Sequence, residues 1–204
     1  ALDDLKTAIS LNPSHISWYQ LTIEPNTPFH SKPPTLPQDD VLWEIQDKGI
    51  ELLAQAGYQQ YEISAFSKPK FECQHNLNYW QYGDYIGIGC GAHGKITDAN
   101  SKSIFRTVKV KHPKGYLDIE RQHLDHLTTV KEDELPFEYM MNRLRLQSKF
   151  TLEDYQKATG LAVDSVLPTL ERAKKRQLME QHDDHWQVSQ HGHRYLNDLL
   201  EMFL

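Results

Sequence analysis

The chain has 204 residues, of which 39% are hydrophobic and 25% charged, values that are typical of a globular protein. Its formal net charge is −6, and both parts contribute: residues 1–129 carry 12 basic and 15 acidic side chains, and residues 130–204 carry 10 and 13. This balance argues against a nucleic-acid-binding protein. The sequence predicts no transmembrane helix and no signal peptide. Two cysteines exclude a disulfide framework and favour a reducing, cytoplasmic setting.

The first 64 residues predict alternating helices and strands. Apolar residues at helical spacing predict a helix over residues 2–11. Because the chain opens inside this helix, we expect a fragment of a longer protein, although removal of an initiator Met would also leave Ala1 first. Aromatic and β-branched residues predict a strand over residues 15–23, an amphipathic helix follows over residues 38–56, and a second strand covers residues 58–64. This order indicates a βαβ unit with parallel strands, and therefore an α/β fold.

The middle of the chain predicts less regular structure. We expect a loop over residues 65–83, followed by a short apolar strand over residues 85–89 that is buried on both faces. Residues 103–110 could pair as a β-ribbon with the segment before them, and residues 116–123 predict a short helix.

From residue 130 the pattern becomes helical. Helices are predicted over residues 132–147, over 151–158 between a Thr151 cap and a Gly160 stop, and over 163–177. A hairpin over residues 178–188 and a final helix over 189–204 complete a small α+β domain of winged-helix-like order. We therefore expect two domains, residues 1–129 and 130–204.

Polar residues follow the predicted strands at the ends where ligands bind in parallel α/β folds. They are Thr22 and Glu24, Glu62 and Ser64, and Gly91, Ala92 and His93. The agreement of three strand ends favours a binding site, although polar residues also cap strands that bind nothing.

A cluster of His75, Asn76, Tyr79 and Trp80 lies in the predicted loop. His75 could ligate a metal or haem iron, the two aromatic rings could lie against a flat macrocycle, and the asparagine could fix the loop. On composition alone, a structural loop is the better interpretation, because one histidine without other ligands is a weak metal signal. The glycines from Gly87 to Gly94 form no dinucleotide-binding motif.

Two groups of basic residues have alternative interpretations. Arg106, Lys109, Lys111 and Lys114 could pair with propionates or other carboxylates, although a solvated ribbon face suits at least the last two better. Arg172, Lys174, Lys175 and Arg176 would suit a DNA-binding helix, against which the acidic balance of this region argues. Cys73 and Cys90 are interpreted as reduced thiols.

The combination of motifs resembles the radical SAM haem chaperone family, HemW, and its sister family, the oxygen-independent coproporphyrinogen III oxidases (HemN). The resemblance runs along the whole chain, and the segments that carry it are HISWYQLTIEP (15–25), YEISAF (61–66), HNLNYW (75–80), GIGCGAHG (87–94) and GHRYLN (192–197). It implies the C-terminal part of a partial (β/α) radical SAM barrel followed by a winged-helix-like domain.

The resemblance also implies site residues and cofactors. His75, Asn76, Tyr79 and Trp80 match the HNxxYW pattern associated with haem binding, with His75 as iron ligand. Thr22 and His93 match positions on the S-adenosylmethionine side. The family's CxxxCxxC motif for a [4Fe–4S] cluster is absent from this chain, so S-adenosylmethionine and the cluster are expected only in the full-length protein, and this chain alone is predicted to be inactive.

Three functions therefore stand as hypotheses. The first is haem binding and delivery to a recipient haem protein. The second is oxidative decarboxylation of coproporphyrinogen III, and the third is a winged-helix module that binds nucleic acid or protein. A barrel cut before its sixth strand would also expose an open edge, which predicts self-association.

Overall fold

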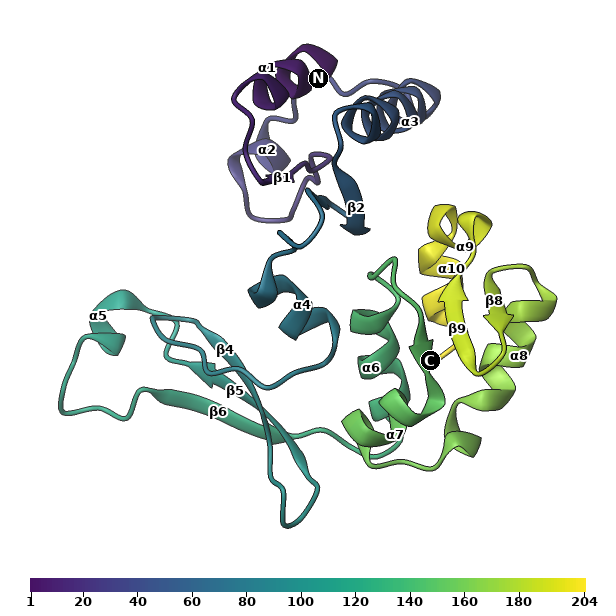
Figure 1. Ribbon diagram of the computed structural model, residues 1–204. Helices are drawn as coiled ribbons and strands as arrows, with labels where there is room; N and C mark the ends of the chain where they lie inside the picture. The colour runs from purple at the N-terminus through teal and green to yellow at the C-terminus, as the bar shows by residue number, and fades with distance from the viewer. The chain divides into compact units, whose positions relative to one another are not determined.

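The computed structural model describes residues 1–204, which form two compact units, Ala1–Cys73 and Gln74–Leu204 (Figure 1). The predicted domain boundary at residue 130 falls inside the second unit, between the strand Leu124–Thr129 and the helix Leu135–Arg143, and it stays a prediction. None of the helices is long and apolar enough to cross a membrane.

The first unit is a small three-stranded sheet with helices packed on it. Its elements are α1 (Leu2–Ser10), β1 (His15–Ser17), α2 (Pro28–Ser31), α3 (Asp39–Gln55), β2 (Gln59–Glu62) and β3 (Ala65–Ser67). Helices α1 and α3 contact each other and bury the apolar faces that the sequence predicts. The core consists of Leu5, Ile16, Leu53, Tyr58 and Phe66.

The order of the sheet is β1-β3-β2, with β3 antiparallel to both neighbours. Strands β1 and β2 therefore run parallel, as predicted, but β3 lies between them, in residues that the sequence analysis assigned to a loop. A tight turn makes this possible: the Glu62 carboxylate accepts a hydrogen bond from the Ser64 N–H at 3.0 Å. The strand predicted over residues 15–23 ends at Ser17, because its partner β3 begins opposite it, at Ala65.

The second unit begins with α4 (Gln74–Trp80) and continues into a ribbon of three antiparallel strands in the order β4-β5-β6 (Figure 1). The strands are β4 (His93–Thr97), β5 (Ile104–Lys109) and β6 (Leu124–Thr129), and α5 (Pro113–Tyr116) lies between the last two. The predicted pairing of residues 103–110 with the preceding segment is confirmed.

Two predictions in this region are wrong. The helix expected over residues 116–123 instead begins at Pro113, whose fixed φ suits a first helical turn, and ends at Tyr116. The strand expected over residues 85–89 reduces to one bridge between Tyr85 and Lys95. Ile86 and Ile88 are 77% and 85% exposed, because no second strand pairs with them.

Residues from 130 onward form helices around a third three-stranded sheet, β7-β9-β8. Its hairpin is confirmed, and Trp186 in β9 is fully buried in the main core together with Tyr139, Tyr155 and Leu170. The elements are α6 (Leu135–Arg143), β7 (Phe150–Thr151), α7 (Leu152–Thr159), η1 (Val163–Ser165), α8 (Leu167–Lys175), β8 (Met179–His182), β9 (His185–Val188), α9 (Gln190–Arg194) and α10 (Leu196–Glu201).

Helix α7 has the predicted ends, and the helices after it are interrupted. Thr151 and Asp154 form a reciprocal capping box at the start of α7, and Gly160 ends it in the left-handed conformation, with φ 75°. The helix predicted over residues 163–177 is split into η1 and α8 at Val166, and the last helix is split at Tyr195, where ψ is 40°.

We predict that Thr151→Ala lowers the free energy of unfolding of the second unit by about 1 kcal/mol, because the N–H of Asp154 loses its capping acceptor. Thr151→Ser keeps an equivalent oxygen and should stay close to the wild type. Urea unfolding followed by Trp fluorescence measures the difference. Equal loss in both variants would contradict the capping interpretation.

Candidate functional site

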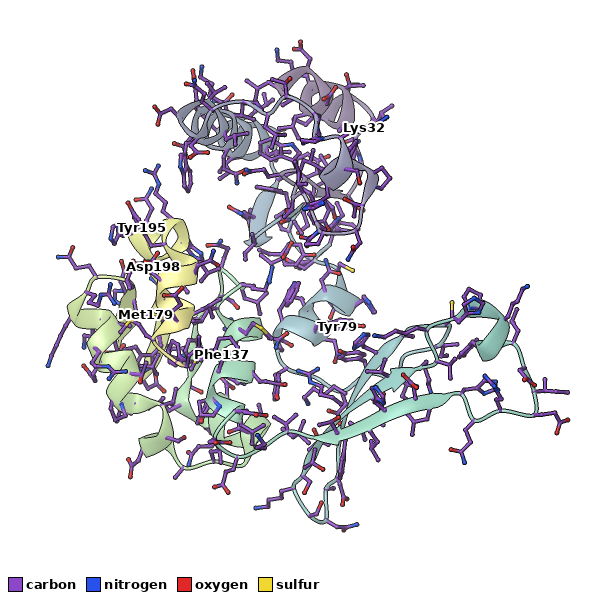
Figure 2. All side chains as sticks on the ribbon, turned by 180° about the vertical axis from the view of Figure 1, so that it is seen from behind. Lys32, Tyr79, Phe137, Met179, Tyr195 and Asp198 are labelled. Carbon is purple, nitrogen blue, oxygen red and sulfur yellow. The ribbon has the colours of Figure 1, made fainter.

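The histidine of the HNLNYW segment lies on a helix and not in the predicted loop. Helix α4 places His75 and Tyr79 one turn apart, and their rings meet edge to face with centroids 4.8 Å apart (Figure 2 labels Tyr79). The His75 side chain is exposed. The helix therefore presents an imidazole to solvent beside an aromatic ring.

A second aromatic ring extends this surface. Tyr85 packs on Tyr79 with centroids 4.1 Å apart, and its hydroxyl accepts a hydrogen bond from Arg106 Nη1 at 3.3 Å. Burial raises the pKa of Tyr85. Sequence reasoning missed this partner, because it placed Tyr85 in a buried strand. The exposed Ile86 follows directly.

Arg106 is held by a carboxylate of the chain itself. Its Nη2 and Nε donate to Glu138 Oε2 at 2.5 and 3.1 Å, and the Tyr82 hydroxyl donates to the same oxygen at 2.9 Å. Burial, followed by the charge of Glu138, raises the pKa of Tyr82. Arg106 was one of four basic residues predicted as possible partners for propionates, but the structure pairs it with Glu138. This ion pair connects the ribbon to α6.

Trp80 packs against a different cation. The guanidinium of Arg145 lies 4.7 Å from the centroid of the Trp80 ring. Trp80 Nε1 and Arg145 Nε are both buried and have no hydrogen-bond partner. Arg145 lies in the turn directly after α6, and the packing of α4 on α6 brings it to Trp80. Because this contact is tertiary, no sequence pattern could have indicated the pair.

Asn78 closes the turn after α4, which supports the interpretation that the asparagines fix this segment. Its Nδ2 donates to the carbonyl of Asp84 at 3.0 Å, and its own carbonyl accepts from the N–H of Gly83 at 2.7 Å. A Cβ on Gly83 would lie 2.2 Å from Asn78 Oδ1, so glycine is required there. Asn76 is half-buried on the same helix.

An ion pair between a buried lysine and a partly exposed aspartate holds the next segment on the ribbon. Lys95, which is 2% exposed, donates from Nζ to Asp84 Oδ1 at 2.7 Å and lies 4.3 Å from the centre of the Tyr82 ring. Burial alone would raise the pKa of Asp84, but hydrogen bonds from Lys95 and Thr97 outweigh it and the pKa lies below its usual range. This pair ties residues 83–85 to β4.

His93 lies at the exposed start of β4, where the chain passes very close to itself. A Cβ on Gly87 would lie 2.1 Å from the His93 carbonyl oxygen, so the close approach explains this glycine without any ligand. Cys90 is exposed in the same segment, and Cys73 is half-buried in the first unit.

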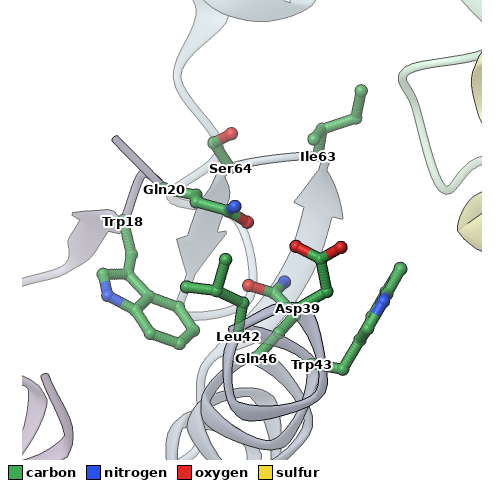
Figure 3. Close-up of a pocket in the computed structure, with 8 residues that line it drawn as sticks. All are labelled: Trp18, Gln20, Asp39, Leu42, Trp43, Gln46, Ile63 and Ser64. Carbon is green, nitrogen blue, oxygen red and sulfur yellow. The ribbon is translucent and has the colours of Figure 1, made fainter. Parts of the chain in front are cut away.

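Thr22 is exposed in the first unit, in the irregular segment after β1. The first unit has a cavity of about 360 Å³, and Ser64, one of the predicted strand-end residues, is part of its lining (Figure 3). Thr22 does not line it, and the Glu62 side chain is buried in its own turn. The lining residues are Trp18, Gln20, Asp39, Leu42, Trp43, Gln46, Ile63 and Ser64.

No three His, Cys, Asp or Glu side chains come together in an arrangement that could hold a metal ion. A free divalent ion is normally bound by three or more protein ligands. A single histidine such as His75 instead suits an iron that a macrocycle already holds.

Comparison with known proteins gives three findings. The family model of the HemN C-terminal domain matches residues 130–195. The proteins named heme chaperone HemW from Escherichia coli and Haemophilus influenzae are 51% and 50% identical over 204 residues, which is 100% of this chain but 53% and 52% of those proteins. The chain thus spans about half the length of the curated relatives it matches.

The third finding is structural. The solved structure of coproporphyrinogen III oxidase (HemN) from Escherichia coli, described as a radical SAM enzyme, matches with a TM-score of 0.72 over 99% of this chain and 50% of that chain. The sequence identity is 18%, so this likeness shows a shared α/β fold.

We predict that Asp84→Asn destabilises the second unit by about 2 kcal/mol at pH 7, a value discounted for the partly exposed carboxylate, because Lys95 keeps a buried charge without its counterion. Since the folded-state pKa of Asp84 is depressed, its contribution is present above the unfolded pKa, near 4, and is lost as the pH falls through the folded value.

Urea unfolding at pH 7 and at pH 3 measures this effect. The difference between wild type and Asp84→Asn should shrink at the lower pH. Asp164→Asn, an exposed carboxylate in η1, is the control and should show no such change. A constant difference between the two pH values would show that the ion pair is not its source.

Proposed function

Because this chain belongs to the HemW family, we propose that it carries the haem-binding helix of a protein that binds haem and delivers it to recipient haem proteins. The observation that carries the proposal is α4, which presents the exposed His75 beside Tyr79 within the HNxxYW pattern. The identity of about half of all positions to proteins named heme chaperone HemW supports the same function.

The residues around α4 fit a haem. Haem supplies an iron with open axial positions and a flat apolar ring. His75 offers one imidazole nitrogen as axial ligand, and the rings of Tyr79 and Tyr85, which pack against each other at an angle of 39°, offer an aromatic surface. Ile86 and Ile88, both strongly exposed, add apolar area directly after Tyr85. Exposure of this kind suits a protein that has to release its ligand to another protein.

The remaining cofactors belong, in this proposal, to the longer protein. Three cysteines ligate the cluster of a radical SAM protein, and Cys73 and Cys90 cannot supply them. We assign Thr22 and His93 to the S-adenosylmethionine side on the family pattern alone, and we expect no radical chemistry from this chain by itself. We also propose that residues 1–129 are part of a radical SAM barrel and that residues 130–204 form a winged-helix-like domain with a packing role.

We predict that this chain binds haem saturably and that His75→Ala weakens binding at least tenfold, because the iron loses its axial ligand. Absorbance titration with haem measures the affinity and the Soret shift. His191→Ala is the matched control: His191 and Tyr195 form the same kind of exposed pair one turn apart, with ring centroids 4.7 Å apart. The proposed role of His75 would be contradicted if both variants lost haem affinity equally, or if neither lost any.

The coproporphyrinogen oxidase alternative is tested on the full-length protein with its cluster and S-adenosylmethionine. We predict no conversion of coproporphyrinogen III at catalytic rates and transfer of bound haem to a haem-depleted acceptor. Product analysis by chromatography measures the first, and recovery of the acceptor's spectrum the second. Catalytic formation of protoporphyrinogen would replace the chaperone proposal with the oxidase.

A further inference from the structure

A polar cavity of about 480 Å³ lies in the second unit, lined by residues of α6, of α7, of the loop between them and of the segment directly after α4. It adjoins the haem-binding helix, because Gln81 and Tyr82, the two residues after α4, are part of its wall. The other lining residues are Tyr139, Arg143, Ser148, Lys149, Asp154, Lys157 and Ala158.

Arg143 is a buried cation that lacks a full set of acceptors. It is 6% exposed, and its Nη2 donates to the Ser148 carbonyl at 2.9 Å, the Ser148 hydroxyl at 3.1 Å and the Lys149 carbonyl at 2.5 Å. All three acceptors are uncharged. Its Nη1 is buried without any hydrogen-bond partner. The negative charge of Asp154 acts on the guanidinium, but burial has the larger effect and lowers the pKa of Arg143. A buried guanidinium in this state is incomplete, because burying a charge is costly unless an opposite charge compensates it.

Three cations and one carboxylate line the cavity. Besides Arg143, the cations are the exposed Lys149 and Lys157, and Lys157 Nζ also forms an ion pair with Glu153 Oε1 at 2.7 Å. The carboxylate is Asp154, whose Oδ2 accepts hydrogen bonds from the N–H and the hydroxyl of Thr151 at the start of α7. The cations are therefore in excess, and an anionic ligand would be attracted to this cavity.

The unsatisfied atom of this cavity is a donor, which points to an acceptor group. Arg143 Nη1 is one of four buried side-chain atoms without a hydrogen-bond partner, and it is the one among them whose residue lines the cavity. A ligand that satisfies it has to bring an oxygen acceptor, and a carboxylate brings two on one planar group that matches a guanidinium.

We propose that this cavity is a carboxylate-binding site, with Arg143 as the buried donor and Lys149 and Lys157 as the charges at its opening, and that it takes a propionate arm of the tetrapyrrole bound at α4. The inference rests on the function proposed above. From His75 to Trp80, the last residue of α4, the helix rises by about 7.5 Å, and the wall of the cavity begins at the next residue, Gln81. A tetrapyrrole spans such a length between its iron and its carboxylates.

The experiment compares haem with its dimethyl ester, which keeps the iron and the ring but has no propionate charge. Both are titrated into this chain under identical conditions and followed by absorbance. The wild type should bind haem about tenfold more tightly than the ester. Lys149→Gln with Lys157→Gln should lower this preference to about threefold, because Arg143 remains in place, while the affinity for the ester stays unchanged.

The matched control is Lys131→Gln with Lys175→Gln. It removes the same charge from the second unit. Lys131 forms an exposed ion pair with Glu134, as Lys157 does with Glu153, and Lys175 is exposed like Lys149. It should keep the wild-type preference. Arg143→Lys, with its fold checked by circular dichroism, keeps the charge but not the planar fork, and should lower the preference only in part.

The outcomes separate the two proposals. If the wild type binds neither compound, the haem function fails and this site fails with it. If it binds both compounds equally well, haem binding stands and the carboxylate site is overturned. A preference that keeps its full wild-type value in the Lys149 and Lys157 double variant also overturns the site, and so does an equal loss in the control double variant.

Discussion

The ion pair between Arg106 and Glu138 is the contact on which the second unit depends. It joins the middle strand of the ribbon to α6, and the hydroxyls of Tyr82 and Tyr85 complete it from the segment between α4 and β4. Both charged side chains are only about a quarter exposed, at 27% and 22%, so the pair is well shielded from solvent screening. The network therefore fixes three parts of the chain that are distant in sequence.

The position of α4, the helix that carries His75, depends on this network. Helix α4 has seven residues, too few to be stable by itself, so its structure has to come from packing. Tyr79 packs on Tyr85, which Arg106 holds, and Trp80 packs under Arg145 at the end of α6. His75 faces solvent on a short helix that is anchored at its other end. This arrangement keeps a ligand site rigid and still leaves it open.

The sequence predicted those parts of the fold whose signals are local. The capping box at Thr151, the left-handed Gly160 and the hairpin around Asp183 all follow from neighbouring residues, and the structure confirms them. It did not reveal β3, because that strand exists only through pairing with β1 and β2. The apolar run from Tyr85 resembles a buried strand, yet Ile86 and Ile88 are exposed, since burial depends on partners that a run of residues cannot show. For the same reason the HNLNYW segment identified His75 and Tyr79, while Tyr85 and Arg145 emerged only from tertiary contacts.

The distribution of charge around α4 distinguishes two kinds of cation. Arg106 and Lys95 are neutralised by Glu138 and Asp84 within the chain, so they stabilise the fold. Arg143 has only neutral hydrogen-bond acceptors and one unsatisfied nitrogen, although it is 6% exposed and thus nearly as buried as Lys95, which is 2% exposed. The fold thus pairs two of these cations with carboxylates and leaves the third without an ion pair, so an added anion would be bound most favourably at Arg143. Because Arg143 lines a cavity that begins directly after the helix of His75, the proposed iron ligation and the proposed carboxylate binding would act on one tetrapyrrole.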